Sequence, residues 1–294
     1  MAECASIEHE LIEGSRILAE AGIPRASGEA SRIWAGLAGV TVGDVWLHRA
    51  AAVTDAQVGR FRSAIQRRAI GEPLAYVLGV AGFRYLDVLV DRRVLIPRPE
   101  TEGLVDRVLS WGASRNAGGA AVAGWGMVAD IGTGSGCIAL SLAAEGNFAR
   151  IIATDNTAAA LEVAAANLAA IAPATPVEFR LGSLLGPVQG MMLDAVVSNP
   201  PYLTPQEYRA LERSVRDFEP VESLIGGSNG LRHTEVLVRE SAGLIVPGGL
   251  LAIEVDSSRA DESLSLAREA DWLDARIELD LFGNPRYLLA IKES

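Results

Sequence analysis

Between residues 127 and 254, the sequence alternates short apolar segments with longer segments whose apolar residues follow a helical period. The segments that we predict to be strands are residues 127–130, 151–155, 177–181, 194–198 and 250–254. Such alternation predicts an α/β fold, in which a mostly parallel sheet carries helices on both faces. Residues 275–279 and 287–291 flank the turn signal Gly283-Asn284-Pro285, which predicts a final antiparallel pair of strands.

The first predicted strand leads into a glycine-rich loop and then into a helical pattern. The residues of this loop are Gly132, Thr133, Gly134, Ser135 and Gly136. Glycines allow a sharp turn and a close approach of the backbone to a ligand, and the new helix directs its free N–H groups there. The pattern predicts a nucleotide-type site. Residues 134–139 also fit the G-x-G-x-x-A dinucleotide fingerprint, so the loop alone leaves the cofactor open.

Asp155 ends the second predicted strand, roughly 20 residues after the glycine loop, where an acid can bind both hydroxyls of a ribose. The alternative is that Asp155 caps the helix that begins near Thr157, because aspartate is a favourable N-cap residue. Asn156 and Thr157 can also serve as caps, so the two roles can be divided between neighbouring residues.

Asn199, Pro200, Pro201 and Tyr202 follow the strand at 194–198. The Asn199 side chain offers a carbonyl acceptor, and the prolines present backbone carbonyls on a stiff frame because they lack an N–H. Tyr202 supplies a face on which a flat amide or base can stack. The segment therefore suits a site that holds a planar NH2 group by its two hydrogens. The alternative is a Pro-Pro turn that simply ends the strand.

Together, the glycine loop, Asp155 and the Asn199–Tyr202 segment resemble the Rossmann-like class of S-adenosyl-L-methionine-dependent methyltransferases. NAD enzymes have no use for an Asn-Pro-Pro-Tyr strand end, which favours S-adenosyl-L-methionine as the cofactor, with S-adenosyl-L-homocysteine as product. Four further segments narrow the resemblance to the release-factor glutamine N5-methyltransferases, the PrmC/HemK family. These segments are Gly71–Gly79, Ile96–Glu102, Phe218–Pro220 and Gly226–Leu231.

The resemblance implies methyl transfer to the side-chain amide N5 of the glutamine in the Gly-Gly-Gln motif of class I peptide-chain release factors. Oδ1 of Asn199 and the carbonyl of Pro200 would accept the two amide hydrogens, and Tyr202 would pack on the amide plane. The predicted catalytic residues are therefore Asn199, Pro200, Pro201 and Tyr202. Asn199 would lie beside the cofactor as well as the acceptor.

The resemblance also implies a set of cofactor-binding residues. They are Asp130, Gly132, Thr133, Gly134, Ser135, Gly136, Asp155, Ser183, Leu184 and Asn199. Asp130 would either neutralise the ammonium group of the cofactor or form a structural hydrogen bond to the glycine loop. The chain departs from the family at Ser183, where an acid is usual beside the adenine, at Asp256 and Arg259, which replace Gly and Gln, and at Asn229, where Asp is common.

The periodicity and the resemblance predict three parts of the chain. Residues 1–74 form an N-terminal helical domain for substrate recognition, in which Thr54 caps one of the helices. Residues 75–96 form a β-hairpin linker, with a strand over residues 83–90. Residues 97–294 form the methyltransferase domain, which begins with a helix.

Composition limits the partners that we expect. The formal net charge is −11 at pH 7, whereas proteins that bind duplex DNA usually carry a basic face. We therefore expect no direct nucleic-acid partner. Four arginines on one predicted helix, Arg60, Arg62, Arg67 and Arg68, form either a solvated face or a docking patch for an acidic protein surface. The histidines lack metal-ligand spacing, so we expect no metal site.

The remaining sequence features favour a cytoplasmic enzyme. The chain has no uninterrupted apolar stretch of membrane-spanning length and no secretory signal, and its two cysteines are far apart. Two alternative functions stay open at this stage. One is an adenine-N6 methyltransferase for DNA or RNA, which would extrude a base and need a cationic channel. The other is a degenerate binding protein that keeps the fold without catalysis.

Overall fold

The computed structural model describes residues 6–116, 124–270 and 272–293. The chain divides into two compact units, Met1–Val80 with Glu212–Phe218, and Ala81–Leu211 with Glu219–Ser294. The observed division falls a few residues after the expected boundary at residue 74. The reason is that residues 74–78 form a short helix, which packs against helices of the first unit.

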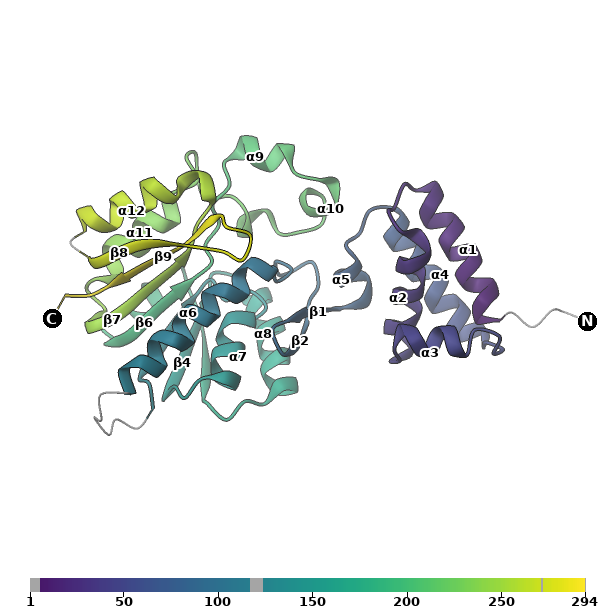
Figure 1. Ribbon diagram of the computed structural model, residues 1–294, viewed down its shortest axis with the longest axis horizontal. Coiled ribbons are helices and arrows are strands. Elements are labelled where there is room, and N and C mark those ends of the chain that lie inside the picture. Colours follow the sequence, from purple (N-terminus) through teal and green to yellow (C-terminus); the bar gives the residue numbers. More distant parts are fainter. Residues whose placement is uncertain (1–5, 117–123, 271, 294) are drawn as a thin grey trace, which may run out of the picture. The chain divides into compact units, whose positions relative to one another are not determined.

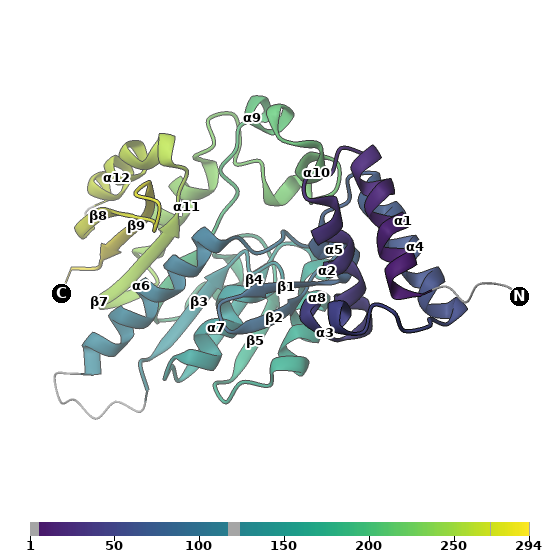
Figure 2. The same ribbon diagram turned by 45° about the vertical axis from the view of Figure 1, so that its right-hand side comes forward.

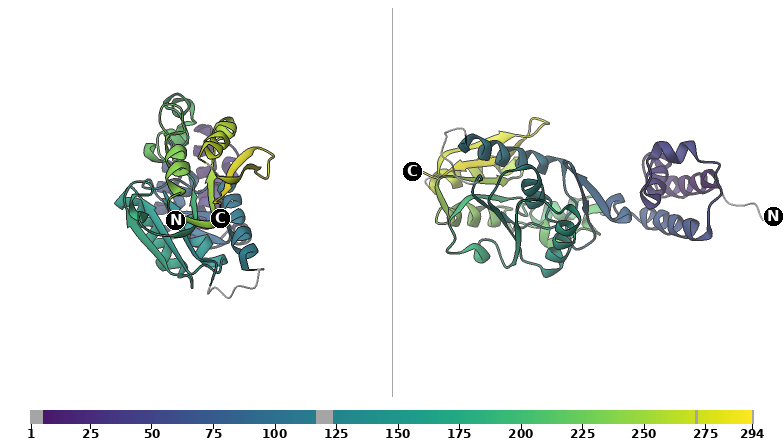
Figure 3. Two further views of the ribbon diagram at one scale, coloured as in Figure 1. Left: turned by 90° about the vertical axis from the view of Figure 1, so that its left-hand side faces the viewer. Right: turned by 90° about the horizontal axis from the view of Figure 1, so that it is seen from below.

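The first unit is helical. Its helices before residue 80 are α1 (Ile7–Glu20), α2 (Ala26–Ala38), α3 (Val42–Leu47), α4 (Asp55–Ala69) and α5 (Leu74–Leu78). They pack around a core that includes Leu18, Ile33 and Phe61. The right-hand view of Figure 3 shows the helices of this unit side by side. Thr54 caps α4 as predicted, because its hydroxyl accepts a hydrogen bond from the backbone N–H of Gln57.

Three of the four arginines on α4 form ion pairs with acids of their own unit, at 2.6–2.8 Å. The pairs are Arg62 with Glu10, Arg67 with Glu72, and Arg68 with Glu29. Two of these carboxylates are almost fully buried. The arginines therefore join α4 to α1, α2 and the segment before α5, and most of their charge is balanced within the unit. This pairing is a third arrangement, distinct from both a solvated face and a free docking patch.

The second unit contains a seven-stranded sheet in the order β5-β4-β3-β6-β7-β9-β8. Figure 1 shows this sheet with helices packed around it. The strands are β3 (Met127–Ile131), β4 (Arg150–Asp155), β5 (Val177–Leu181), β6 (Leu193–Ser198), β7 (Ile245–Glu254), β8 (Leu273–Leu279) and β9 (Pro285–Ile291). The sheet is parallel from β5 to β7, and β9 pairs antiparallel with β7 and β8. The α/β fold and the antiparallel end are confirmed. β7 begins five residues before its predicted start, across Pro247-Gly248-Gly249, which local propensity disfavours in a strand.

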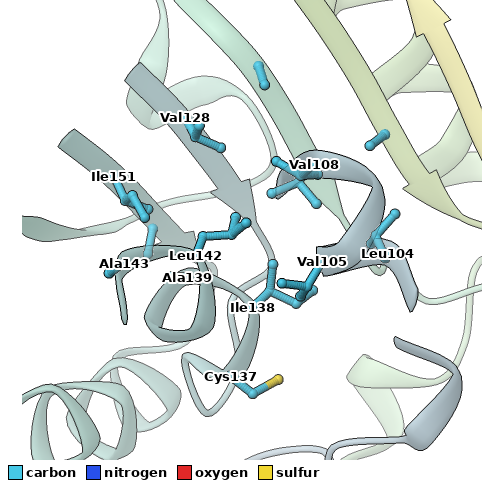
Figure 4. Packing of buried hydrophobic residues seen from close by; sticks show 14 of the residues in the cluster. Leu104, Val105, Val108, Val128, Cys137, Ile138, Ala139, Leu142, Ala143 and Ile151 are labelled. Atoms are coloured by element: carbon cyan, nitrogen blue, oxygen red, sulfur yellow. The ribbon is translucent and has the colours of Figure 1, made fainter. Parts of the chain in front are cut away.

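Helices cover both faces of the sheet. They are α6 (Pro99–Asn116), α7 (Cys137–Glu145), α8 (Ala158–Ile171), α11 (Arg232–Ser241) and α12 (Ala260–Glu269). Short helices α9 (Pro205–Ala210) and α10 (Arg213–Arg216) follow β6, and α10 belongs to the first unit. Adjacent residues Val128 and Ala129 are both fully buried, although successive strand residues point to opposite faces. Val128 faces α6 and α7 (Figure 4), whereas Ala129 joins the cluster with α11 and α12.

The predicted single strand over residues 83–90 is wrong. The structure has two short strands instead, β1 (Val80–Phe83) and β2 (Leu86–Leu89), which form a two-stranded sheet (Figure 2). Arg84 lies in the turn between them with a φ of 54°. Its guanidinium bonds both oxygens of Glu145 at 2.7 Å and pairs with Asp106 at 2.8 Å. These partners, which are distant in the sequence, stabilise the turn. The alternation of apolar residues along the segment gives no indication of it.

Candidate active site

The carboxyl ends of β4, β3 and β6, which are neighbours in the sheet, border one cavity. Its volume is about 840 Å³ counted with its open mouth, and all its lining residues belong to the second unit. The predicted site residues that line it are Gly132, Gly134, Asp155, Ser183, Leu184, Asn199, Pro200 and Pro201. The other predicted residues, Asp130, Thr133, Ser135, Gly136 and Tyr202, lie outside this lining. Motifs from separate parts of the sequence therefore meet at one edge of the sheet.

The end of β4 holds the glycine loop through backbone hydrogen bonds. The N–H groups of Gly132 and Thr133 both donate to the carbonyl of Thr154, at 2.9 and 2.8 Å. The N–H of Gly134 donates to Oδ2 of Asp155 at 2.9 Å. Gly134 has a φ of 54°, in the left-handed region where glycine is strongly favoured. The loop is thus fixed against the strand whose last residue is Asp155.

Asp130 lies beneath the loop and is fully buried. Its Oδ2 accepts hydrogen bonds from Oγ1 of Thr133 at 2.6 Å and from the N–H of Ala139 at 3.2 Å. Burial raises the pKa of Asp130 to about 7 against the effect of these bonds. Its Oδ1 has no hydrogen-bond partner within the described ranges. The structural bond to the loop is therefore observed, and contact with a cofactor ammonium stays a prediction.

Asp155 bridges the glycine loop and the start of α8. Its Oδ1 accepts hydrogen bonds from the N–H and the hydroxyl of Thr157, at 3.0 and 3.1 Å. Thr157 is the N-cap of α8, since its hydroxyl accepts from the N–H of Ala160 at 3.3 Å. The capping role that the sequence left open belongs to Thr157. Asp155 itself lines the cavity.

The amide of Asn199 is held by a buried hydrogen-bond chain that sequence reasoning missed. Nδ2 of Asn199 donates to Oγ1 of Thr101 at 3.0 Å, and that hydroxyl donates to Oε2 of Glu254 at 2.7 Å. Thr101 is 2% exposed and Glu254 is 1% exposed, so water is excluded from both. In the described part of the chain, no donor reaches Oδ1 of Asn199. The carbonyl end of the amide is therefore the end left for a ligand.

Residues 226–231 pack against the backbone of the segment that begins at Asn199. The N–H of Gly226 donates to the carbonyl of Leu203 at 2.8 Å. A Cβ on Gly226 would lie 2.3 Å from the Pro201 carbonyl oxygen, and one on Gly230 would lie 2.3 Å from that of Tyr202. The two backbones lie so close together that neither position has room for a side chain larger than that of glycine. The resemblance singled out this segment, and the contacts give its physical role.

We expect Gly226→Ala to lower the free energy of unfolding by about 1–3 kcal/mol, the usual cost of inserting a methyl group into a packed site. Urea denaturation followed by tryptophan fluorescence would measure the change. Gly243→Ala is the matched control, because its Cβ would meet only the Glu240 carbonyl at an ordinary 3.6 Å. Equal stability of the two variants would contradict the proposed contact.

The segment Ile96–Glu102 is tied to the chain beyond residue 218. Buried Glu219 accepts a hydrogen bond from the N–H of Ile96 at 3.1 Å and pairs with the guanidinium of Arg98 at 2.5 Å. The next residue, Pro220, lines the cavity. Two segments that the resemblance singled out separately, Ile96–Glu102 and Phe218–Pro220, are therefore joined through Glu219.

Two family models match separate parts of the chain. Residues 11–79 match the PrmC N-terminal domain, and residues 122–217 match the methyltransferase small domain. A release factor glutamine methyltransferase from Moorella thermoacetica is 37% identical over 288 residues, covering 98% of this chain and 99% of that protein. One from Koribacter versatilis is 38% identical over 241 residues, covering 82% of each.

The chain belongs to the release factor glutamine methyltransferase family. Among solved structures, a methyltransferase from Pyrococcus furiosus aligns with a TM-score of 0.53 at 17% identity, covering 78% of this chain and 98% of that one. This likeness supports the Rossmann-like methyltransferase fold alone. Neither alternative function, adenine-N6 methylation or a non-catalytic binding role, is favoured by these comparisons.

Three departures from the expected pattern of the release factor glutamine methyltransferases form one network. Nε of Arg259 donates to the Asn229 carbonyl at 2.8 Å, and Nη1 pairs with Asp256 at 3.2 Å. Nη2 donates to both carboxylate oxygens of Glu207 at 2.7 Å. Arg259 therefore joins α9, the segment 226–231 and the chain after β7. The replacements at positions 256 and 259 supply each other's charge partner, and neither touches Asn199.

Ser183 is the departure that faces the cavity. It is exposed just after β5, and its carbonyl accepts a hydrogen bond from the N–H of Gly186 at 3.0 Å. Leu184 beside it has a φ of 46° and also lines the cavity. At the position where the resemblance led us to expect an acid, the chain therefore has a short, exposed hydroxyl side chain.

Within the described residues, no group of three or more His, Cys, Asp or Glu side chains is arranged to hold a metal ion. In the same part of the chain, no helix is both long and apolar enough to cross a membrane.

Proposed function

We propose that this chain transfers the methyl group of S-adenosyl-L-methionine to N5 of the glutamine in the Gly-Gly-Gln motif of class I release factors. The observation that carries the proposal is the Asn199 amide, whose NH2 end is bound by Thr101 and whose carbonyl end is free beside the cavity. Relatives described as release factor glutamine methyltransferases support the same substrate, because one of them aligns over almost the whole of both chains.

The residues around the cavity suit S-adenosyl-L-methionine. We assign the methionine and ribose part to Gly132–Gly136, the ribose hydroxyls to Asp155, and the adenine to Ser183 and Leu184. Asp130 lies behind the loop with a free carboxylate oxygen, which suits an ammonium group. When bound, the cofactor supplies an electrophilic methyl group on a sulfonium that is already a good leaving group.

The chain itself would contribute position and electrostatics. An amide nitrogen is a poor nucleophile because its lone pair is delocalised into the carbonyl. Oδ1 of Asn199 and the carbonyl of Pro200 would accept its two hydrogens, which increases the electron density on nitrogen and directs the lone pair. Burial raises the pKa of Tyr202, so this residue stays neutral and can pack on the amide. Pro200 and Pro201 keep the acceptors on a rigid backbone.

We also propose that the N-terminal helical unit recognises the release factor and that the protein works in the cytoplasm, as part of translation termination. The match of residues 11–79 to the PrmC N-terminal domain supports the first assignment. The ion pairs of α4 join it to α1, α2 and the segment before α5, which would help to hold a recognition surface in place.

The function is tested by incubating the protein with labelled cofactor and, in parallel, a class I release factor, duplex DNA and total RNA. We expect label in the release factor alone, and none when its Gly-Gly-Gln glutamine is changed to alanine. Label in DNA or RNA would favour the adenine alternative. Absence of label from all three would leave the non-catalytic alternative standing.

Ser183→Asp is expected to tighten cofactor binding by about 1–2 kcal/mol, because a carboxylate at this position can accept a hydrogen bond from the adenine NH2 group. Calorimetric titration with S-adenosyl-L-homocysteine would measure the change. Ser183→Ala serves as the control and should bind nearly as the unchanged protein does. Weaker binding by the aspartate variant would remove Ser183 from the adenine site.

A further inference from the structure

We propose that Thr101 and Glu254 are positioning residues that fix the orientation of the Asn199 amide, with its oxygen toward the acceptor nitrogen. The inference rests on the proposed function for its catalytic consequence. The orientation itself is a separate property of the folded chain. Neither residue was singled out by the site motifs, although Thr101 lies within the segment Ile96–Glu102.

The direction of the chain follows from the number of hydrogens available. A threonine hydroxyl has one hydrogen and two acceptor lone pairs. Because Thr101 donates its hydrogen to Oε2 of Glu254, at 2.7 Å, it can only accept from Asn199. The amide must then present Nδ2 to Thr101, at 3.0 Å, and Oδ1 elsewhere. The carboxylate thus sets which end of an otherwise nearly symmetrical amide faces the substrate.

A reversed amide would present the wrong chemistry to the acceptor. Rotation by 180° would place the NH2 group of Asn199 where the substrate NH2 group binds, so that donor would face donor. The three residues come from different elements, α6 for Thr101, the end of β6 for Asn199 and the end of β7 for Glu254. Because Thr101 and Glu254 are buried, water cannot readily replace either of them in the chain.

The orientation of the Asn199 amide would depend on whether Glu254 is protonated. The charged groups that face it are Arg286, Glu100 and Arg98. Other titratable side chains that interact with it are Tyr202, Tyr287 and Cys137. Burial raises the pKa of Glu254 to about 7. Once protonated, Glu254 can donate to Thr101, whose hydroxyl is then free to donate to Oδ1 of Asn199 and reverse the amide.

The first test reads the orientation without any substrate. The side-chain NH2 signals of Asn199, assigned by their loss in Asn199→Ala, would be followed by NMR in the full-length protein. We expect one hydrogen to be protected from exchange above pH 7 and to lose protection at lower pH. Thr101→Val should remove the protection and Thr101→Ser should keep it. Unchanged signals in Thr101→Val would overturn the inference.

The second test reads turnover on a release factor. Thr101→Val should lower kcat by about 10–100-fold without changing cofactor affinity, by analogy with the loss of a residue that orients a metal ligand. Thr101→Ser should remain near the unchanged protein. Thr175→Val is the matched control, because Thr175 is buried before β5, at the opposite end of the strands.

The variant Glu254→Gln tests whether Glu254 orients the Asn199 amide through its charge or only fills space in the core. The unchanged protein should lose activity as pH falls below about 7, whereas Glu254→Gln should lack this fall because glutamine does not titrate. A fall that persists in Glu254→Gln would overturn the inference and point to another group, such as cavity-lining His233. If the unchanged protein methylates no release factor while the NMR result holds, the proposed function fails and the orientation mechanism stands.

Discussion

Replacing Asn199 with alanine should lower kcat by about 10²–10³ while cofactor affinity stays nearly unchanged, as when one preorganised hydrogen-bond partner is removed from an active site. The side chain is held at Nδ2 by Thr101, so its carbonyl is already oriented before a substrate arrives. Alanine removes that acceptor, and only the Pro200 carbonyl would remain to bind the substrate NH2 group. Single-turnover methylation of a release factor would measure the loss.

Cofactor affinity should be measured on the same Asn199→Ala preparation by calorimetry with S-adenosyl-L-homocysteine. Asn147→Ala is a suitable control, because Asn147 is exposed between α7 and β4, and among the described residues it forms a hydrogen bond through its backbone carbonyl alone. Turnover within a few-fold of the unchanged protein would exclude Asn199 from the role assigned to it. A large loss of cofactor affinity would instead indicate that Asn199 serves mainly the cofactor.

The strands at the centre of the sheet were predictable because they are buried on both faces. β3 and β6 are mostly apolar, and the structure places their ends within one residue of the predicted limits. The pattern failed where stability comes from distant contacts. Arg84 adopts a left-handed turn that Glu145 stabilises from 61 residues away, and no local periodicity records such an ion pair.

Among the site residues, too, those that follow a local sequence pattern were predicted, and those that depend on contacts between distant residues were missed. The glycine loop, Asp155 and Asn199 each end a strand, so parallel packing brings them to one edge of the sheet. Thr101 and Glu254 are 153 residues apart in the sequence. Locally, Thr101 resembles an ordinary residue of a first helical turn, and Glu254 an ordinary strand end. Their role depends on burial and on the direction of a hydrogen bond, which only the folded structure supplies.

Asp155→Ala should weaken cofactor binding by about 1–3 kcal/mol, the usual cost of leaving a buried hydrogen-bond donor without its acceptor. The carboxylate has two functions that alanine removes together. It faces the cavity, where it would bind the ribose hydroxyls, and it accepts the N–H of Gly134 at 2.9 Å, which fixes the glycine loop. Calorimetric titration with S-adenosyl-L-homocysteine would measure the loss, and a thermal unfolding curve would verify the fold.

Two further variants separate these functions. Asp155→Asn keeps one oxygen acceptor but loses the charge, so its affinity should lie between those of Asp155→Ala and the unchanged protein. Asp261→Ala removes an exposed acid from the first turn of α12 and should bind normally. If Asp155→Ala bound S-adenosyl-L-homocysteine as tightly as Asp261→Ala, the carboxylate would not contact the ribose. The acid would then serve only to hold Gly134 and Thr157, and the ribose hydroxyls would need another partner at the end of β4.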